Sequence, residues 1–180
     1  MERPMSMRTV LHEADISRAL TRIAHEILES NRGAENLVLL GIPTRGVTLA
    51  HRLGLLISEI AQQSVPVGAL DVTLFRDDLA KHPTRSPRPT EIPVGGIDGK
   101  TVVLVDDVLF SGRSIRAALD AIQSIGRPAV VRLAILVDRG HRELPIRPDF
   151  IGKNIPSART ERVNVRLFEN DGAEEVTIGE

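Results

Sequence analysis

The sequence predicts a single α/β domain in which a central, mainly parallel sheet is flanked by helices. Three short apolar segments indicate buried strands, at Asn36–Leu40, Thr101–Val105 and Val130–Val137. Continuously apolar strands are typical of parallel sheets that are covered on both faces. Segments with helical periodicity separate the strands, which is the order of a parallel α/β sheet. The length of 180 residues suits one domain with a core of its own.

The first element is an expected helix that starts at Asp15 as its N-cap and stops at Gly33. Its apolar residues recur at helical spacing, at Ile16, Ala19, Leu20, Ile23, Ile27 and Leu28. The opposite face carries Arg18, Thr21, Arg22, His25 and Glu29. After the strand at 36–40, the loop Gly41–Gly46 leads into a second expected helix at Val47–Ala61.

The remaining elements alternate in the same way. Residues Val65–Phe75 alternate like a strand, whereas Arg76–Pro93 lose all periodicity and hold four prolines, which predicts a long surface loop. A third helix is expected at Ser114–Ile125, ended by Gly126. Two short edge strands are expected near the end, at Val163–Leu167 and Glu175–Ile178.

Composition excludes several classes of protein. The 23 basic and 24 acidic residues give a net charge of −1, which excludes a globally basic nucleic-acid binder but allows a local basic face. Most of the positive charge is arginine, whose planar fork suits phosphates, although a GC-rich genome produces the same bias. Aromatic residues make up 2%, too few for a surface that stacks bases. The absence of cysteine excludes disulfides, thiol nucleophiles and Cys-ligated metals.

The same features favour a cytoplasmic protein. A chain without cysteine fits a reducing compartment. Residues Met1–Arg8 have no apolar segment, and no apolar run approaches the length that spans a membrane. The histidines suggest no transition-metal site because they are dispersed, at His12, His25, His51, His82 and His141.

The most informative motif is Val102–Ser114, Val-Val-Leu-Val-Asp-Asp-Val-Leu-Phe-Ser-Gly-Arg-Ser. Asp106 and Asp107 follow a buried strand at its carboxyl end, where open α/β sheets bind ligands. Adjacent carboxylates repel each other unless they meet hydroxyls or a cation. The loop Phe110–Ser114 opens a helix, so its backbone N–H groups and its serines form an anion site. Gly112 lets a phosphate approach the backbone closely.

This motif is neither a P-loop nor a dinucleotide-binding fingerprint, because the required glycine spacings are missing. The acid pair precedes the phosphate loop. An acid pair for ribose hydroxyls beside a cradle for a 5′-phosphate describes a site for a phosphoribosyl group. The alternative is a buried strand with an acid-capped turn and a helix, without a ligand.

The segment Val102–Ser114 resembles the thirteen-residue signature of type I phosphoribosyltransferases. Four other segments carry a second resemblance: Leu20–Glu26, Gly41–Gly46, Leu74–Leu79 and Val137–Asn154. Together they resemble the PyrR family, the bifunctional pyrimidine operon regulators and uracil phosphoribosyltransferases, over about Leu11–Leu167. The resemblance implies the type I phosphoribosyltransferase fold, with residues 1–180 as a single domain. It also implies a small hood, formed by about residues 137–157 with the N- and C-terminal segments, and a flexible lid loop at 76–93.

The resemblance implies two activities. One is transfer of ribose 5-phosphate from phosphoribosyl pyrophosphate (PRPP) to uracil, giving UMP and pyrophosphate, with Mg²⁺ accompanying PRPP. The other is binding of pyr mRNA under the control of uridine nucleotides (UMP and UTP). A homodimer or homotetramer is also implied. Retention of only one activity, or transfer to another base, are the alternatives.

Residues for PRPP follow from this chemistry. Thr44, Arg45 and Gly46 come after a strand and suit a pyrophosphate loop, although they also suit a simple turn before a helix. Asp106, Asp107 and Arg45 are the expected catalytic residues, and Mg²⁺ held with PRPP would lie near the acid pair, with no metal fixed by the protein alone. The expected PRPP- and nucleotide-binding set is Thr44, Arg45, Gly46, Arg76, Arg85, Asp106, Asp107, Val108, Leu109, Phe110, Ser111, Gly112, Arg113 and Ser114.

Phe110 bears on the choice of base. Purine phosphoribosyltransferases usually place an Asp at this loop position, where it exchanges a proton with the ring. A Phe cannot do so, which argues against a purine, although Phe110 could also serve only to pack the loop. By resemblance, backbone groups around Arg139 and Ile151 read uracil, and Arg139 is also a candidate for pyrophosphate or its metal. A structural role is the alternative for both residues.

Two polar groups are candidates for RNA binding. The first is the helix face with Arg18, Thr21, Arg22 and His25, and the second is His141, Arg142, Arg147 and Lys153. If both groups meet on one surface, they form a phosphate-binding patch despite the low net charge. The scarcity of aromatic residues favours recognition by hydrogen bonds and shape. The alternative is a solvated helix face and a loop that supports the active site.

Overall fold

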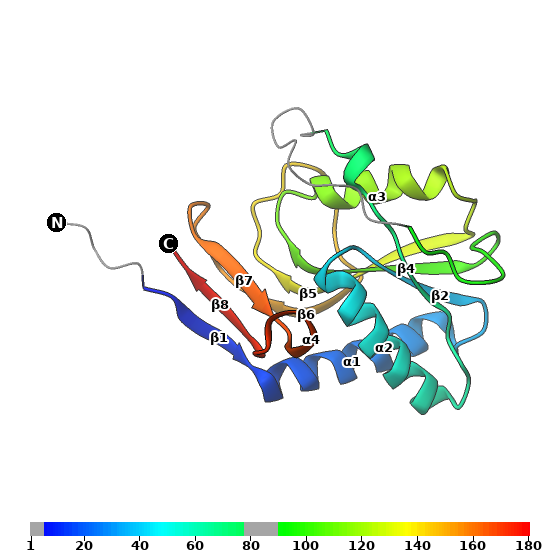
Figure 1. The fold of residues 1–180 in the computed structure, drawn as a ribbon, viewed down its shortest axis with the longest axis horizontal. Coiled ribbons are helices and arrows are strands. Elements are labelled where there is room, and N and C mark those ends of the chain that lie inside the picture. Colours follow the sequence, from blue (N-terminus) through cyan, green and yellow to red (C-terminus); the bar gives the residue numbers. More distant parts are fainter. Residues whose placement is uncertain (1–5, 78–89) are drawn as a thin grey trace.

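The computed structural model describes residues 6–77 and 90–180. A parallel sheet of five strands forms the centre, and a smaller antiparallel sheet of three strands lies beside it (Figure 1). In spatial order, the central strands are β3 (Val67–Ala69), β2 (Leu37–Gly41), β4 (Thr101–Leu109), β5 (Val130–Asp138) and β6 (Phe150–Asn154). The smaller sheet contains β1 (Arg8–His12), β8 (Glu175–Gly179) and β7 (Arg162–Arg166).

Helices cover both faces of the central sheet, as the apolar strands predict. The helices are α1 (Glu13–Asn31), α2 (Arg45–Ala61), α3 (Arg113–Gln123) and the short α4 (Phe168–Asp171). Alternate residues of β4 point to opposite faces: Val103 belongs to the core with α1 and α2, whereas Leu104 belongs to the core with α3. Figure 1 shows α1 and α2 on one side of the sheet and α3 on the other. The predicted α/β class is confirmed.

The start of α1 differs from the prediction. The helix begins at Glu13, after His12, so Asp15 is not the N-cap but the third helical residue. Its Oδ2 accepts the backbone N–H of His12 at 2.8 Å. A carboxylate here still satisfies a free amide of the first turn and suits the helix dipole. The helix ends at Asn31, two residues before the predicted stop.

Residues 65–75 form less strand than their alternation predicts. Only Val67–Ala69 join the sheet, and Thr73–Phe75 form a 3₁₀ turn, η1. The cause is local, because Asp71 Oδ1 accepts both the backbone N–H and the hydroxyl of Thr73. Such side-chain contacts offer the backbone an alternative to ladder hydrogen bonds.

Four further strands depart from the sequence-based expectation. The strand β4 continues to Leu109, so the acid pair lies within the strand and not beyond its end. The strand β8 lies between β1 and β7, so only β7 of the two predicted edge strands is an edge. The strands β1 and β6 were not predicted, since five-residue segments that contain exposed polar residues give little periodicity.

Most of the predicted lid loop, residues 78–89, lies outside the described residues. On its far side Glu91 forms an antiparallel bridge with Ala69, which returns the chain to the edge of the central sheet. The division into core, hood and lid stays a prediction. Among residues 6–77 and 90–180, no helix combines the length and apolarity that a bilayer crossing requires.

Candidate active site

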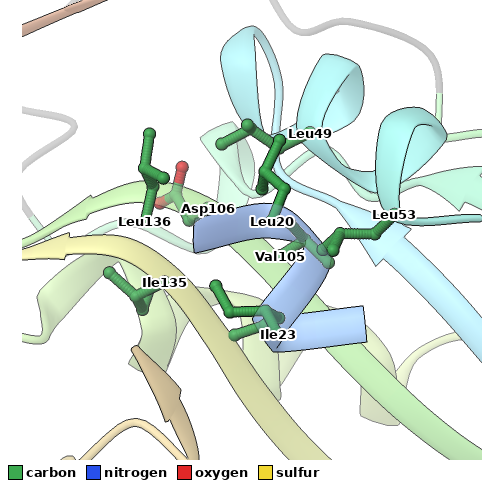
Figure 2. Close-up of a pocket in the computed structure, with 9 residues that line it drawn as sticks. Leu20, Ile23, Leu49, Leu53, Val105, Asp106, Ile135 and Leu136 are labelled. Atoms are coloured by element: carbon green, nitrogen blue, oxygen red, sulfur yellow. The ribbon is translucent and has the colours of Figure 1, made fainter. Parts of the chain in front are cut away.

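The acid pair lies near the carboxyl end of β4, the middle strand of the central sheet. Asp106 and Asp107 are both partly buried, and Asp106 is in register with Ile135 of β5. Figure 2 shows Asp106 among apolar side chains that include Leu20 of α1, Leu49 of α2 and Leu136 of β5. The gap between these residues is too small to admit water, so it belongs to the core and is not a binding site.

The apolar surroundings affect the protonation of Asp106. Burial raises the pKa of Asp106 well above its ordinary value of 3.8, and the charge and hydrogen bond of Asp107 raise it further. The positive charge of Arg76 partly opposes this rise. Arg76, which is predicted to bind PRPP, therefore lies within electrostatic range of Asp106. A protonated carboxyl group at Asp106 would donate one hydrogen bond and accept another, which suits a hydroxyl ligand.

The loop after β4 is the predicted anion site, and its backbone turns sharply into α3. Val108 and Leu109 complete the strand, and Gly112 precedes α3 with a φ of +92°, which favours glycine. A Cβ at Gly112 would lie 3.3 Å from Ile146 Cβ, so this turn also packs against the segment after β5. Ser111 precedes α3 and Ser114 lies in its first turn, whose amides have no partner within the helix.

A second loop, Gly41–Gly46, reaches the same place from β2. The peptide bond between Pro43 and Thr44 is cis, and the backbone N–H of Ile42 donates to the Val105 carbonyl at 2.9 Å. A Cβ at Gly46 would lie 2.5 Å from the Val105 carbonyl oxygen and 3.3 Å from Asp106 Oδ1. Only a glycine allows the first turn of α2 to lie so close to the acid pair. The two predicted phosphate loops therefore meet at the same end of β4.

Arg45 and Arg113 are both ion-paired. The carboxylate of Asp171 accepts from Arg45 Nε at 3.1 Å and from Nη2 at 2.6 Å. This hydrogen bond raises the pKa of Arg45, and the charge of Asp107 adds to the effect. Arg113 is exposed and pairs with Asp77 at 2.5 Å. Arg85 lies outside the described residues.

Phe110 lies between two residues of the segment that follows β5. The Arg139 guanidinium carbon is 4.3 Å from the centroid of the Phe110 ring, and the His141 ring meets Phe110 edge-on at 5.8 Å. Arg139 is buried and donates to the carbonyls of Ala158 and Glu161. Burial lowers its pKa, and its Nε has no partner among the described residues.

The comparisons with known proteins agree with this geometry. A model of the phosphoribosyl transferase domain matches residues 7–169. A protein of Leifsonia xyli called "Bifunctional protein PyrR" is 67% identical, over 98% of both chains. The chain belongs to the PyrR family. Another relative of the same name, from Streptomyces coelicolor, is 61% identical over 96% of this chain and 89% of its own.

Solved structures place the PyrR-family chain in the same fold as purine enzymes. Hypoxanthine phosphoribosyltransferase from Trypanosoma cruzi, solved in complex with the product IMP, has a TM-score of 0.73 and 16% identity. The match covers 100% of this chain and 97% of that structure. At this identity the likeness shows the fold alone, and it confirms the predicted type I phosphoribosyltransferase fold.

The predicted contacts to the base remain predictions, and the structure adds one relevant hydrogen-bond donor. Ile151 lies in β6, and its carbonyl accepts from Arg22 Nη2 at 2.7 Å, as does the carbonyl of Gly152. Arg22 thus connects the polar face of α1 with the strand expected to read uracil. Lys153, in the same strand, is exposed.

Within this PyrR-family chain, the first group of RNA candidates lies together. Arg18, Thr21, Arg22 and His25 are all exposed on α1. Arg18 pairs with Asp15 at 2.6 Å and Arg22 with Glu26 at 3.2 Å. Contacts of this kind between exposed groups are weak and release readily.

The second group of RNA candidates divides into two kinds. Arg147 and Lys153 are exposed. His141 Nε2 lies 2.6 Å from the Ser157 carbonyl. Arg142 donates to the carbonyls of Phe110 and Ile146 and to the carboxylate of Asp138. Arg142 therefore links the phosphate loop to the segment after β5, a role that sequence patterns did not indicate.

A magnesium ion fits the acid pair only together with a phosphate ligand. Among the described residues, no group of three or more His, Cys, Asp or Glu side chains could hold a metal. Asp106 and Asp107 supply carboxylate oxygens, the ligands that Mg²⁺ takes from proteins while phosphates and water complete its shell.

Sequence reasoning missed two residues of this site. Asp171 binds Arg45 from 126 positions along the chain, and Asp138 binds Arg142. Asp138 could have been found, because it directly follows the predicted strand Val130–Val137, at the end of the sheet where ligands bind. No local signal marks Asp171.

Proposed function

We propose that the protein transfers the 5-phosphoribosyl group from PRPP to uracil and forms UMP and pyrophosphate. The observation that carries this proposal is the packing of Gly46 on Asp106. It brings the two loops predicted to bind anions to one acid pair, and PRPP is a ribose with a phosphate group at each of two positions. Membership of a family whose relatives are named bifunctional and that carries a phosphoribosyl transferase domain supports the proposal.

The reaction needs the chain to hold the ribose, to stabilise the positive charge on it and to stabilise the leaving pyrophosphate. Uracil N1 attacks C1′ of the ribose while the bond from C1′ to the pyrophosphate oxygen breaks, the leaving group takes the electron pair, and the N1 proton passes to solvent. The transition state has oxocarbenium character, as in glycosyl cleavage. Asp106 and Asp107 would hold the ribose hydroxyls and face this positive charge. Arg45 and the first amides of α2 would stabilise the negative charge on pyrophosphate.

Magnesium would enter with PRPP near Asp106 and Asp107. When bound, it supplies positive charge that neutralises the phosphate oxygens of the leaving group. The protein contributes the two carboxylates and the position of the ribose between the loops.

Uracil is favoured over a purine by Phe110. This ring lies against Arg139 and His141 and offers no proton to a base.

We further propose that the protein binds pyr mRNA and that uridine nucleotides control this binding. The favouring observation is the contact of Arg22 with the carbonyls of Ile151 and Gly152. It connects the exposed face of α1 to a strand expected to contact the base, so an occupied site could bias the α1 face between two states. A cytoplasmic homodimer or homotetramer is part of this proposal.

The enzyme activity is tested by UMP formation from uracil and PRPP, with and without Mg²⁺. Arg45→Ala and the pair Asp106→Asn with Asp107→Asn should remove most activity while the chain stays folded. Full activity in these variants would refute the assignment of the site. Competition with hypoxanthine and guanine tests which base is the substrate. Inhibition of UMP formation by either purine would contradict the assignment of uracil as the substrate.

The regulatory activity is tested by filter binding to pyr leader RNA, with and without UMP. A nucleotide-dependent affinity supports the proposal. Absence of RNA affinity at low salt would leave an enzyme alone.

A further inference from the structure

Residues 169–174, here called the acidic segment, bind one face of α2. Arg45, Thr48 and Arg52 lie three and four residues apart, so they share this face. The partners are Asp171 for Arg45, Asn170 for Thr48, and Glu169 with Glu174 for Arg52. The first of these contacts involves the arginine of the expected pyrophosphate loop.

The Asp171 carboxylate is itself held in place. Its Oδ2 accepts the backbone N–H of Leu167 at 2.9 Å as well as Arg45 Nε. Its side chain is 19% exposed, against 34% for Arg45. Because the backbone N–H of Leu167 fixes this carboxylate, the carboxylate gives Arg45 a defined orientation. Bidentate pairs of this kind are geometrically specific.

The contact leaves most of the guanidinium available. Asp171 takes one hydrogen from Nε and one from Nη2. An arginine has five N–H donors, so both hydrogens of Nη1 and one of Nη2 remain. Arg45 is the first residue of α2, beside Gly46 and the acid pair, where an anion would meet these donors.

We propose that Asp171 is a positioning residue that holds the Arg45 guanidinium in the orientation that receives the pyrophosphate group of PRPP. This inference rests on the proposed function. Without the carboxylate, the long side chain of Arg45 must be ordered when the ligand binds. Ordering one such side chain weakens affinity by about three- to tenfold.

The test measures binding of Mg²⁺–PRPP and of UMP by calorimetry, because UMP lacks the pyrophosphate group. Asp171→Asn should raise the Kd for PRPP by about three- to tenfold and leave the Kd for UMP unchanged. Asp171→Glu keeps the carboxylate and should restore at least part of the PRPP affinity. Glu169→Gln is the matched control in the same segment: Arg52 keeps Glu174, so both affinities should equal those of the wild type.

Three outcomes would overturn the inference. Unchanged PRPP affinity in Asp171→Asn would show that Arg45 needs no orientation. Tighter PRPP binding would show that Asp171 competes with the anion instead of positioning its partner. Equal loss of PRPP and UMP affinity with a lower Tm would show a purely structural role. If the wild-type protein binds neither PRPP nor UMP, the proposed function is refuted instead. The wild-type titration alone distinguishes this case.

Discussion

Gly46 and Asp106 are in direct contact across two elements of the fold: a Cβ on Gly46 would lie 3.3 Å from Asp106 Oδ1. The contact joins the first turn of α2 to the acid end of β4. Each element adjoins one of the two predicted anion loops, so the contact sets the distance between the ligand groups that the loops would hold.

Gly46→Ala should therefore lower kcat/KM for PRPP by about 100-fold, because the added methyl group must displace α2 from β4, and a shift of about 1 Å has this effect on positioned groups. Steady-state kinetics measures the change. Gly54→Ala, in the same helix, meets the Val67 side chain away from the acid pair. That control should lower stability without lowering kcat/KM to a similar extent, and equal losses in the two variants would contradict the prediction.

Asp106→Asn should stabilise the fold while it removes activity. Burial raises the pKa of Asp106, so the folded state keeps a proton that the unfolded chain has released above about pH 4. The stability of the wild type therefore falls as pH rises from the unfolded pKa to the raised folded pKa.

The excess Tm of Asp106→Asn over the wild type should accordingly grow through that pH window and then level off. Thermal melts over a pH series measure it. Asp120→Asn removes an exposed carboxylate of α3 and controls for the loss of one negative charge. A Tm difference for Asp106→Asn that stays flat with pH would contradict the assignment of a raised pKa.

Arg142→Gln should lower stability by about 2 kcal/mol, because hydrogen bonds from a charged group to two carbonyls and a carboxylate are lost. In a chain of this length, that corresponds to about 4–8 °C in Tm. UMP affinity should fall as well, since the Phe110 carbonyl loses its donor.

Arg147→Gln is the matched comparison for Arg142, since Arg147 is exposed on the same segment. It should leave Tm and UMP affinity unchanged and lower RNA affinity, with the salt slope smaller by about one. If both variants lost RNA affinity alone, with no change in Tm or UMP affinity, Arg142 would act on RNA directly and the prediction would be wrong.

Arg22→Gln and Arg18→Gln should separate two roles of the α1 face, namely RNA binding and the connection to the strand expected to contact the base. Arg22 donates to the carbonyls of Ile151 and Gly152, whereas Arg18 pairs only with the nearby Asp15 among the described residues. Both variants should weaken RNA binding, but only Arg22→Gln should change UMP affinity or the effect of UMP on RNA binding. Titrations with each ligand check this, and identical behaviour of the two variants would count against a connection through Arg22.

Local sequence determined the central fold and most of the candidate site. The apolar segments around Val38 and Val103 predict buried parallel strands because both of their faces must be covered. The spacing of Asp106, Gly112 and Ser114 predicts the second loop because its parts are consecutive in the chain. These properties depend on neighbours within a few residues, which a single sequence displays.

Tertiary structure alone decided which side chains complete the site. Asp171 binds Arg45, and Arg142 binds the Phe110 carbonyl, across 126 and 32 positions of the chain. The place of β8 between β1 and β7 likewise depends on pairing between the two ends of the chain. Such contacts arise only when distant segments pack together. The sequence around a charged residue does not indicate which distant residue will become its partner in the folded protein.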